Sequence, residues 1–421
     1  MKKYKLGELM EVTRGMSLSG EYYSTKGELM RLTLGNFDYH KNCFKEDKSK
    51  ENLYFTGEVK EGFILNKDDI VTPLTEQAIG LLGSTAKIPC SGKYIQSQDV
   101  GLIKCNDKLN PNYAFYLIPS KLVRKQLSVA AQQTKIRHTS PDKIKGCTVW
   151  IPEYDKQEKI GKLLSSLDDK IALNNRINAK LEQMAKRLYD YWFVQFDFPN
   201  ADGKPYKSNG GKMVWNEELK REIPEGWEVK KLGEILILLK DGTHNPPKRQ
   251  EKGIPLLTGT MFGNNFLDYD KATYISEADY KIIHSQYEPH ENDVIITKIG
   301  TLGNVNLLRN IDIPVAIHCN SALLRFDMAL GVYYPFSYCK SDLFKMRLKA
   351  IKGQSIQEFA SLDRISSIKS EVPCVDIINK FDKIVKPIIE KQKSISFENK
   401  KLKEMRDKLL PLLMNGQVVV E

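Results

Sequence analysis

The sequence predicts an α+β protein in which two similar α/β domains are separated by a long antiparallel two-helix coiled coil with pseudo-two-fold symmetry. Three observations predict this architecture. Most of the 421-residue chain is an internal repeat. Each copy begins with short apolar runs between Gly, Asn, Pro and Asp, and ends in a long stretch with apolar residues every three or four positions. A chain of this length is enough for two or three domains.

The internal repeat is strongest in the last part of each copy. Residues 152–188 match residues 373–409 at a constant offset of 221, and ten of these 37 positions are identical. Lys5–Glu8 recurs as Lys231–Glu234 at an offset of 226, which indicates small insertions or deletions in loops. The predicted segments are a first domain at 1–152, a first spacer helix at 153–193, a linker at 194–225, a second domain at 226–373, and a second spacer helix with the C-terminal segment at 374–421.

The two globular segments have the pattern of strands joined by loops. Gly62–Asn66 and Asp293–Thr297 are examples of short apolar runs next to turn-forming residues. A few helical stretches interrupt these runs, for example Tyr113–Leu127. Strands and helices do not alternate regularly, so the pattern favours α+β domains over βαβ units.

Each spacer segment reads as one long amphipathic helix. A helix of 35–40 residues is roughly 55 Å long, and a single apolar stripe of that length needs a partner, for which the other copy is the obvious choice. The predicted seam consists of Ile160, Leu164, Leu167, Ile171, Ile177, Leu181, Met184 and Leu188 in the first helix, and of Phe381, Val385, Ile388, Ile395, Leu402, Met405 and Leu409 in the second.

Four local features bear on these helices. Asp155 with Glu158 resembles a capping box at the start of the first helix, and Asn415-Gly416 is typical of a helix end. Asn174 falls on the apolar stripe and is a candidate for setting the register. Pro387 cannot continue the hydrogen-bond ladder, so we expect the second helix to kink there or to start near it.

The net charge of +11 favours a polyanionic partner. The excess is uneven, because residues 1–150 carry 23 basic and 16 acidic side chains, whereas residues 226–373 carry 18 and 17. If the second domain also binds nucleic acid, it needs a local basic patch rather than bulk charge.

The cysteine pattern and the apolar runs place the chain in the cytoplasm. None of the seven cysteines forms a C-x-x-C pair and the six histidines add no clustered ligands, so we expect reduced thiols and no metal site. No apolar run reaches the ~18 residues of a membrane span, and we expect no secretory signal at the start.

Catalytic motifs of nucleic-acid enzymes are missing from the sequence. Asn245-Pro246-Pro247 resembles part of an amino-methyltransferase motif, but Lys248 stands where an aromatic residue should stack on the base, and no suitable Gly-rich turn precedes it. There is no G-x-x-x-x-G-K-[ST] phosphate loop. We therefore expect no catalytic residues in this chain.

Two similar domains on a paired-helix spacer suit two different DNA half-sites about one helical turn apart. Candidate contacts lie in polar loops, although a solvated turn is an equally good interpretation for each single residue. The candidates in the first domain are Arg14, Ser17, Ser19, Thr72, Thr75, Gln77, Ser84, Thr85, Lys87, Gln133, Thr134, Lys135, Arg137 and His138. Those in the second domain are Lys240, Asp241, Thr243, His244, Asn245, Lys248, Arg249, Thr297, Lys298, Thr301, Asn304, Gln354, Ser355 and Gln357.

Several segments resemble the specificity subunits of type I restriction–modification systems. Trp227–Ile235 resembles the opening of a target-recognition domain in that family. Arg187–Pro199, Gly210–Trp215 and Ile223–Trp227 look like its central segment and linker, and Leu409–Gly416 is similar to its C-terminus. The resemblance covers essentially the whole chain in the family's order.

The resemblance implies a DNA-reading subunit without a catalytic centre. Each target-recognition domain would read one half of a bipartite, asymmetric site, and the coiled coil would set the gap. Two modification subunits would dock on it and supply S-adenosylmethionine-dependent adenine-N6 methylation. Restriction subunits would add ATP- and Mg-dependent translocation and cleavage, so no cofactor is expected on this chain itself.

Two other function classes remain open at the level of sequence. A self-sufficient DNA methyltransferase or nuclease would modify or cut DNA without partners. A coiled-coil scaffold with two unrelated interaction domains would not bind DNA at all.

Overall fold

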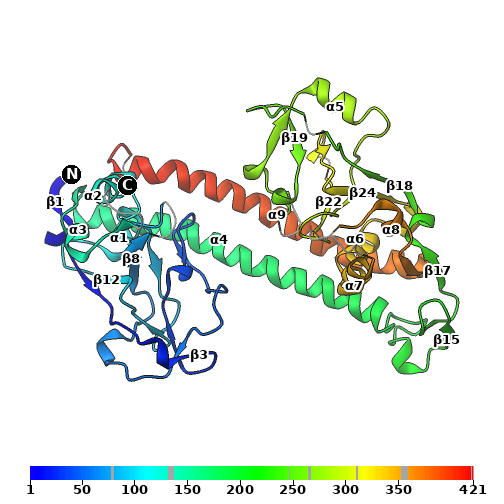
Figure 1. Cartoon of the computed structure of the whole chain (residues 1–421), viewed down its shortest axis with the longest axis horizontal. Coiled ribbons are helices and arrows are strands. Elements are labelled where there is room, and N and C mark those ends of the chain that lie inside the picture. The colour runs from blue at the N-terminus through cyan, green and yellow to red at the C-terminus, as the bar shows by residue number, and fades with distance from the viewer. Residues whose placement is uncertain are drawn as a thin grey trace. The chain divides into compact units, whose positions relative to one another are not determined.

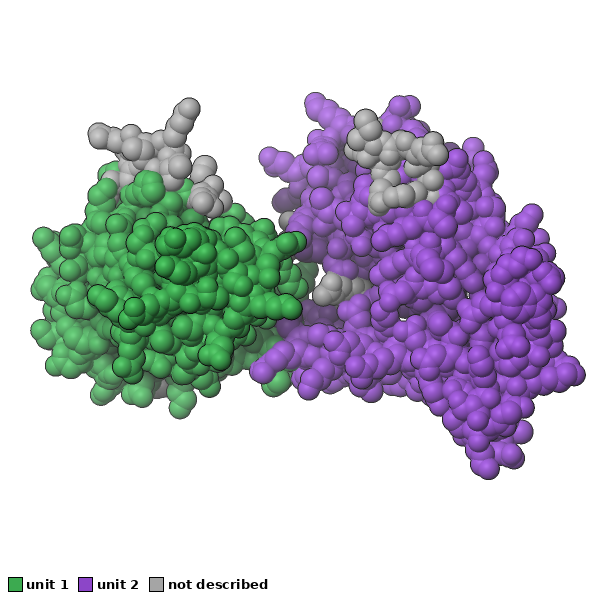
Figure 2. Space-filling model, turned by 60° about the horizontal axis from the view of Figure 1, so that its bottom comes forward, with its two compact units in different colours: residues 1–173, 399–421 green, residues 174–398 purple. Residues whose placement is uncertain are grey.

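The computed structural model describes residues 1–76, 80–130, 137–245, 247–263, 267–309, 312–351, 359–418 and 420. The chain divides into two compact units (Figure 2). Unit 1 comprises residues 1–173 and 399–421, and unit 2 comprises residues 174–398. We use head 1 for residues 1–152 of unit 1 and head 2 for residues 226–373 of unit 2.

Unit 1 combines short strands with three short helices and parts of two long ones. Its strands are β1 (Lys2–Lys5), β2 (Met10–Arg14), β3 (Tyr23–Ser24), β4 (Leu29–Arg31), β5 (Phe37–Asp38), β6 (Cys43–Phe44), β7 (Tyr54–Phe55), β8 (Ile70–Pro73), β9 (Thr75–Glu76), β10 (Ala86–Lys87), β11 (Tyr94–Ile95), β12 (Val100–Cys105), β13 (Arg137–His138) and β14 (Thr148–Ile151). Its helices are α1 (Pro111–Leu117), α2 (Lys121–Ala130), α3 (Pro141–Lys145) and the first half of α4 (Tyr154–Tyr189), joined by the end of α9 (Val375–Met414).

Unit 2 has the same kinds of element. Its strands are β15 (Met213–Asn216), β16 (Arg221–Pro224), β17 (Glu228–Lys231), β18 (Leu236–Asp241), β19 (Ile254–Leu257), β20 (Thr273–Ile275), β21 (Val294–Thr297), β22 (Val305–Leu307), β23 (Ala316–Ile317), β24 (Ser321–Phe326) and β25 (Lys369–Val372). Besides its parts of α4 and α9, its helices are α5 (Glu277–Ile283), α6 (Tyr333–Lys340), α7 (Asp342–Ala350) and α8 (Leu362–Ser366).

The two heads share the topology of their central sheet, although in the described parts of the chain the second sheet has four strands in head 1 and three in head 2. The central sheet has the order β10-β8-β12-β2 in head 1 and β22-β21-β24-β18 in head 2. In each head a second sheet contains one parallel pair, β11 with β4 and β23 with β19. The first and last strands of each head also pair antiparallel, β1 with β14 and β17 with β25. The mixed helix and strand content and the internal repeat confirm the predicted α+β class with two similar domains.

The same local signals start equivalent helices in both heads. The Ser140 side chain accepts a hydrogen bond from the backbone of Lys143 and caps α3, and the Ser361 side chain accepts one from Arg364 and caps α8. A serine at the N-cap satisfies a backbone N–H that the helix leaves open. The two serines are 221 positions apart, so the capping signal is part of the repeat.

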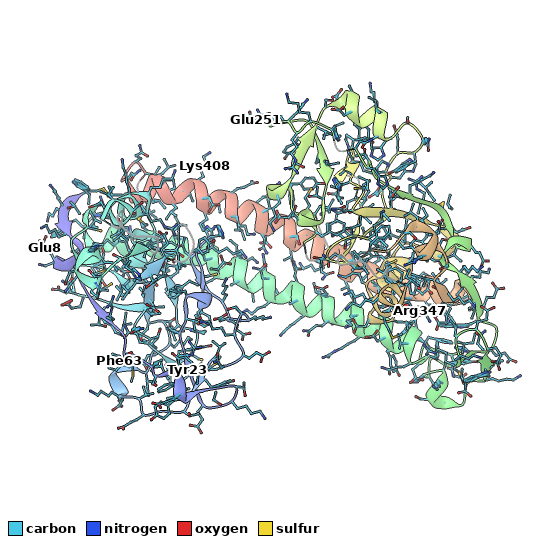
Figure 3. The ribbon with its side chains drawn as sticks, viewed as in Figure 1. Glu8, Tyr23, Phe63, Glu251, Arg347 and Lys408 are labelled. Carbon is cyan, nitrogen blue, oxygen red and sulfur yellow. The ribbon has the colours of Figure 1, made fainter. Side chains whose placement is uncertain are left out.

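Each head has a core that continues onto the long helices. In head 1 the residues around Leu6 and Tyr113 pack with Ile160 and Leu164 of α4 and with Leu413 of α9. In head 2 the core includes Tyr189 of α4 and Phe381 of α9, together with an aromatic group from the segment that follows α4. In Figure 3 Tyr23 and Phe63 of head 1 and Glu251 of head 2 lie away from α4 and α9.

Within unit 1 the first half of α4 lies beside the end of α9 (Figure 1). The Arg406 guanidinium donates to Asp168 at 2.8 Å, and the Tyr116 hydroxyl of α1 donates to the same carboxylate at 2.7 Å. Burial raises the pKa of Tyr116, and the charge of Asp168 raises it further. The phenol is therefore protonated at neutral pH and acts as the donor.

Within unit 2 the second half of α4 lies beside the first part of α9. Asn174 donates to Glu398 at 2.9 Å and Asn178 donates to Ser396 at 3.3 Å, so partner numbers fall along α9 as they rise along α4. This order makes the pair antiparallel, as predicted. The centre of the seam is polar, because Gln392 is buried and its amide also donates to the backbone of Asn178 at 3.2 Å.

The predicted seam residues fall into three groups by burial. Ile160, Leu164, Leu167, Ile171, Phe381, Val385 and Ile395 are buried, whereas Ile177, Leu181, Leu188, Ile388, Leu402 and Leu409 are half-buried. Met184 and Met405 are exposed, so their assignment to the seam is wrong. Ala185, Tyr189, Ile389 and Asn399 take buried positions instead, because a straight helix of 3.6 residues per turn drifts away from a strict heptad pattern.

The predictions for the helix ends and for Pro387 had different outcomes. Gly416 ends α9 with a φ of 69°, which confirms the predicted cap. The predicted capping box is wrong, because α4 begins at Tyr154 and Asp155 already lies in its first turn. The start expected near Pro387 is also wrong: α9 runs unbroken from Val375, because the exposed proline lies between the buried Val385 and Ile389, whose packing holds the helix.

Candidate nucleic-acid interface

The predicted loops of head 2 converge on one short loop, residues 318–320. Thr243 forms a parallel bridge with His318, and the backbone N–H of Lys298 donates to the Asn320 carbonyl at 2.8 Å. Ile299 bridges to Phe359, which follows the predicted segment 353–357. Thus two of the three predicted segments meet at this loop, while Gln354, Ser355 and Gln357 lie outside the described residues.

Head 1 repeats this arrangement around residues 97–99. Met16 forms a parallel bridge with Ser97, and the Leu74 N–H donates to the Asp99 carbonyl at 2.8 Å. The Thr75 hydroxyl lies 3.0 Å from the Asp99 carboxylate and 3.3 Å from Nδ1 of His138, which belongs to β13. The three predicted segments of head 1 therefore meet at one loop. We call 97–99 and 318–320 the central loops.

A glycine lies at each crossing of a predicted segment over the central loop. A Cβ atom on Gly15 would lie 2.2 Å from the Gln96 carbonyl oxygen, and one on Gly242 would lie 1.7 Å from the Ile317 carbonyl oxygen. Real Cβ atoms do not approach backbone oxygens so closely. The close crossing therefore requires glycine at both positions.

Head 2 carries a cluster of charged side chains beside its central loop. Lys298 Nζ and His244 Nε2 lie 3.0 Å and 3.1 Å from Oδ2 of Asp241. The Lys298 side chain is only 3% exposed and its ammonium lies 5.2 Å from the centre of the Phe359 ring. A buried ammonium requires a partner of opposite charge, so Asp241 is fixed in place by the ion pair.

His318 of the central loop is a neutral side chain in this cluster. Burial lowers the pKa of His318, and the nearby Arg249 and His244 lower it further. The Asn320 N–H donates to His318 Nδ1 at 3.2 Å, which requires an unprotonated nitrogen there. The Nε2 atom then carries the proton and is a hydrogen-bond donor.

Head 1 has a polar pocket of about 280 Å³ beside its central loop, and Ser97, Gln98 and Asp99 line part of it. Across the pocket the Arg31 guanidinium lies 3.9 Å from the centre of the Tyr23 ring. Burial raises the pKa of Asp47, another lining residue, but hydrogen bonds from Ser49 and Thr33 outweigh it and leave that pKa below its usual value. The pocket thus combines a cation, an anion and aromatic faces.

The structure separates the predicted site residues by exposure. Exposed side chains are those of Arg14, Ser17, Ser19, His138, His244, Asn245, Lys248, Arg249 and Thr301, and half-buried ones are those of Lys87, Lys240, Asp241, Thr243 and Asn304. Thr72, Thr75, Ser84, Thr85, Thr297 and Lys298 are buried. Gln77, Gln133, Thr134, Lys135 and the side chain of Arg137 lie outside the described part of the chain.

Most of the buried hydroxyl groups form hydrogen bonds within their own head. Thr72 donates to the Ser84 carbonyl at 2.8 Å, Ser84 to the Leu81 carbonyl at 2.7 Å, and Thr85 to the Phe115 carbonyl at 2.9 Å. Thr297 donates to the carbonyl of Thr301. These four side chains shape the loops, because their only donor proton is already used and burial keeps a ligand away from the hydroxyl oxygen.

Sequence reasoning missed the central loops themselves. Gln96 is fully buried and its amide donates to the backbone carbonyls of Thr13 and Val100 at 2.8 Å and 3.0 Å, so it holds the first loop in place. The repeat contained a usable signal, because residues 97–99 and 318–320 are related by the same offset of 221 as the long helices. Both loops are too short to stand out by composition.

Two searches of the described residues gave negative results. No group of three or more His, Cys, Asp or Glu side chains is arranged to hold a metal ion. None of the helices found there has an apolar stretch long enough to cross a membrane.

The chain is similar to curated specificity subunits over most of its length. It is 28% identical over 329 residues to the type I restriction enzyme MjaIX specificity subunit of Methanocaldococcus jannaschii, covering 75% of this chain and 71% of that protein. It is 24% identical over 363 residues to the HindI specificity subunit of Haemophilus influenzae, covering 73% and 77%.

The fold is also that of a solved structure. The S subunit of a type I restriction–modification system from M. genitalium superposes with a TM-score of 0.60 at 19% identity, covering 98% of this chain and 95% of that one. The family model described as the type I restriction modification DNA specificity domain matches residues 1–183 and again residues 224–405. Two matches to one domain model agree with the two heads, and this chain belongs to the family of type I restriction–modification DNA specificity subunits.

Proposed function

We propose that this chain reads a bipartite, asymmetric DNA site, with one half-site for each head. The observation that carries the proposal is the pair of central loops. In each head, equivalent segments meet at the central loop, but the loops carry different side chains. These are Ser97-Gln98-Asp99 in head 1 and His318-Cys319-Asn320 in head 2. A shared scaffold with different polar groups suits two readers that recognise different base sequences.

In this proposal the paired helices set the unspecified gap between the two half-sites. Support comes from the polar contacts of Asn174 and Asn178 within the seam. Asn174 is buried, and a shift of register would move its amide away from Glu398. The same helices are proposed to dock two modification subunits.

The proposed role is non-catalytic. Methylation of adenine N6 with S-adenosylmethionine is assigned to the modification subunits, and ATP- and Mg-dependent translocation and cleavage are assigned to restriction subunits. No cofactor is assigned to this chain. Family membership supports this division, because its members are specificity subunits.

The test is to co-express the full chain with its modification subunit and to map methylated adenines in the host DNA. The expected result is one split, asymmetric motif. Replacing residues 1–152 with those of a relative should change only one half of the motif, and replacing 226–373 should change only the other. A change in both halves, or in neither, would contradict the proposal.

A second arm separates this function from the alternatives. The purified chain alone should neither transfer methyl groups nor cut DNA, and the complex should bind its site less tightly as salt rises, because phosphate contacts release counterions. Methyl transfer by the chain alone would support a self-sufficient enzyme. Failure of the complex to bind DNA at low salt would support a scaffold.

A further inference from the structure

Arg14 and Asp241 occupy the same place in the two heads. Arg14 pairs with Gly101 in the β2–β12 ladder, and Asp241 pairs with Ala322 in the β18–β24 ladder. Each is the last residue of an equivalent strand and is followed by the glycine that crosses the central loop. The register thus aligns a guanidinium in head 1 with a carboxylate in head 2.

The Asp241 carboxylate is held by two side chains and remains partly exposed. Both of its side-chain contacts among the described residues, from Lys298 and His244, fall on Oδ2. The side chain is 23% exposed, whereas that of Lys298 is 3% exposed. The ion pair therefore fixes the carboxylate from the protein side, while the side chain stays partly exposed and can accept a further hydrogen bond.

Lys298 also reduces the repulsion between the Asp241 carboxylate and the phosphates of DNA. An unpaired carboxylate is repelled by the phosphates, and the positive charge 3.0 Å away offsets this repulsion. Arg249, which is close enough to lower the pKa of His318, adds a further positive charge in the same region. The Asp241 carboxylate, with its charge offset by Lys298, can accept a hydrogen bond from a base edge, whereas a phosphate has no donor to offer it.

The equivalent pair in head 1 has the opposite hydrogen-bond character. Leu74 takes the place of Lys298, since its N–H donates to Asp99 as that of Lys298 donates to Asn320. Leu74 is fully buried and supplies no charge, while Arg14 is exposed and offers only donors.

We propose that Arg14 and Asp241 are specificity-determining residues that read bases of opposite hydrogen-bond character at equivalent positions of the two half-sites. Arg14 donates to O6 and N7 of a guanine in the major groove, whereas Asp241 accepts from an exocyclic amino group, on cytosine N4 or adenine N6. This inference rests on the proposed function and assigns a base class to one position in each half-site.

The main experiment transplants the head 1 pair into head 2 and maps methylated adenines with the full chain and its modification subunit. In the double variant Asp241→Arg, Lys298→Leu, the second half of the motif should gain a guanine at one position where the wild-type motif has cytosine or adenine. The first half should not change. Wild-type bases at every position of both halves, with a folded complex, would overturn the assignment of Asp241.

Single variants test each head separately. Arg14→Gln should reduce discrimination for guanine at one position of the first half by roughly 10- to 100-fold. The exposed Lys26→Gln removes the same charge elsewhere in head 1 and should leave the motif unchanged. If the double variant does not fold, Asp241→Asn, Lys298→Met removes both charges of the buried pair with little change in side-chain size, and it should relax the base preference at one position of the second half.

The outcomes distinguish this inference from the proposed function. A wild-type complex that methylates no split motif contradicts the proposed function itself. A wild-type complex with a split motif whose bases do not respond to Arg14→Gln or to either Asp241 variant overturns only the inference. A wild-type base other than guanine at the position that responds to Arg14→Gln also overturns it.

Discussion

Head 1 and head 2 have the same central sheet but are fixed to the long helices by different polar residues. In unit 1 the fully buried Gln157 of α4 accepts from the Asn110 N–H at 2.9 Å and donates to the Lys108 and Pro152 carbonyls, both at 3.0 Å. In unit 2 the Asp382 carboxylate of α9 accepts three backbone N–H groups, from Val332, Tyr333 and Tyr334, at 2.7–3.1 Å.

The two anchors are not equivalent positions of the repeat. At the offset of 221, Gln157 aligns with Ile378 and Asp382 aligns with Gly161. The apolar cores and sheet order were retained in both copies, whereas the polar anchor changed its residue type and its place on the helix. Topology therefore depends on the shared apolar pattern. The polar anchor can change, provided that another residue forms hydrogen bonds with the backbone groups that the anchor contacts.

The largest expected effect comes from removing the charged anchor. Asp382→Ala leaves three N–H groups at the start of α6 without their acceptor. Bonds to a charged acceptor are worth ~1.5–3 kcal/mol each, which sums to about 4.5–9 kcal/mol for three. Water replaces part of this at the part-buried helix start, so we expect a loss of about 3–5 kcal/mol. Gln157→Ala should cost about 2–3 kcal/mol, because the lost bonds are to a neutral amide.

Hydrogen exchange resolved by peptide measures both losses. Asp382→Ala should increase exchange in α6 and leave head 1 unchanged, and Gln157→Ala should increase exchange around α1 and leave head 2 unchanged. Similar losses from both variants would show that the charge of Asp382 adds nothing to anchoring.

The next effect tests the feature that the heads share. Gly15→Ala and Gly242→Ala should each cost about 2–3 kcal/mol, because the new methyl group meets a backbone carbonyl that cannot move aside. Gly62→Ala is the control, since a Cβ at that position meets nothing within 4 Å and should change stability little. Thermal denaturation of the three variants provides the measurement, and a tolerated alanine at position 242 would contradict the close crossing.

Sequence reasoning predicted the features that depend on periodicity. The internal repeat gave the two heads, and the apolar stripe gave α4, α9 and the buried ends of their seam, such as Leu164 and Phe381. It could not place Met184 or Met405, because which face of a long helix is covered depends on the partner. Nor could it predict that α9 passes through Pro387, since packing of the flanking residues outweighs local propensity there.

The candidate site was predictable only as a set of loops. Arg14 and Asp241 were identified as polar loop residues, but their equivalence depends on strand register, which no local pattern gives. Ser97 and His318 were missed because their importance comes from long-range pairing, of Ser97 with Met16 and of His318 with Thr243.

A smaller effect concerns pH and should distinguish the heads. Burial lowers the pKa of both His284 and His318 in head 2, so the folded protein keeps them neutral below the ordinary value of 6.5. As pH falls below about 6.5 the unfolded chain takes up protons that the folded chain excludes, and head 2 loses stability.

Hydrogen exchange at pH 7 and pH 5 measures this loss, after correction for the intrinsic exchange rate. In His284→Gln the loss in head 2 should be smaller, because glutamine keeps an acceptor for the Ile317 N–H without titrating in this range. An unchanged pH response in that variant would show that His284 does not contribute.

The smallest expected effect concerns the polar part of the seam in unit 2, where stability and register can be separated. The Oε1 atom of Gln392 and the Oδ1 atom of Asn178 are buried without a hydrogen-bond partner. Gln392→Leu stabilises the protein by removing a buried acceptor without a partner, and destabilises it by removing the 3.2 Å bond to the Asn178 carbonyl. The two effects oppose each other, so the free energy of unfolding should change by less than about 1 kcal/mol. If the polar seam sets the register, the same variant should methylate sites with more than one gap length. A single unchanged gap would show that Gln392 is not needed to fix the register.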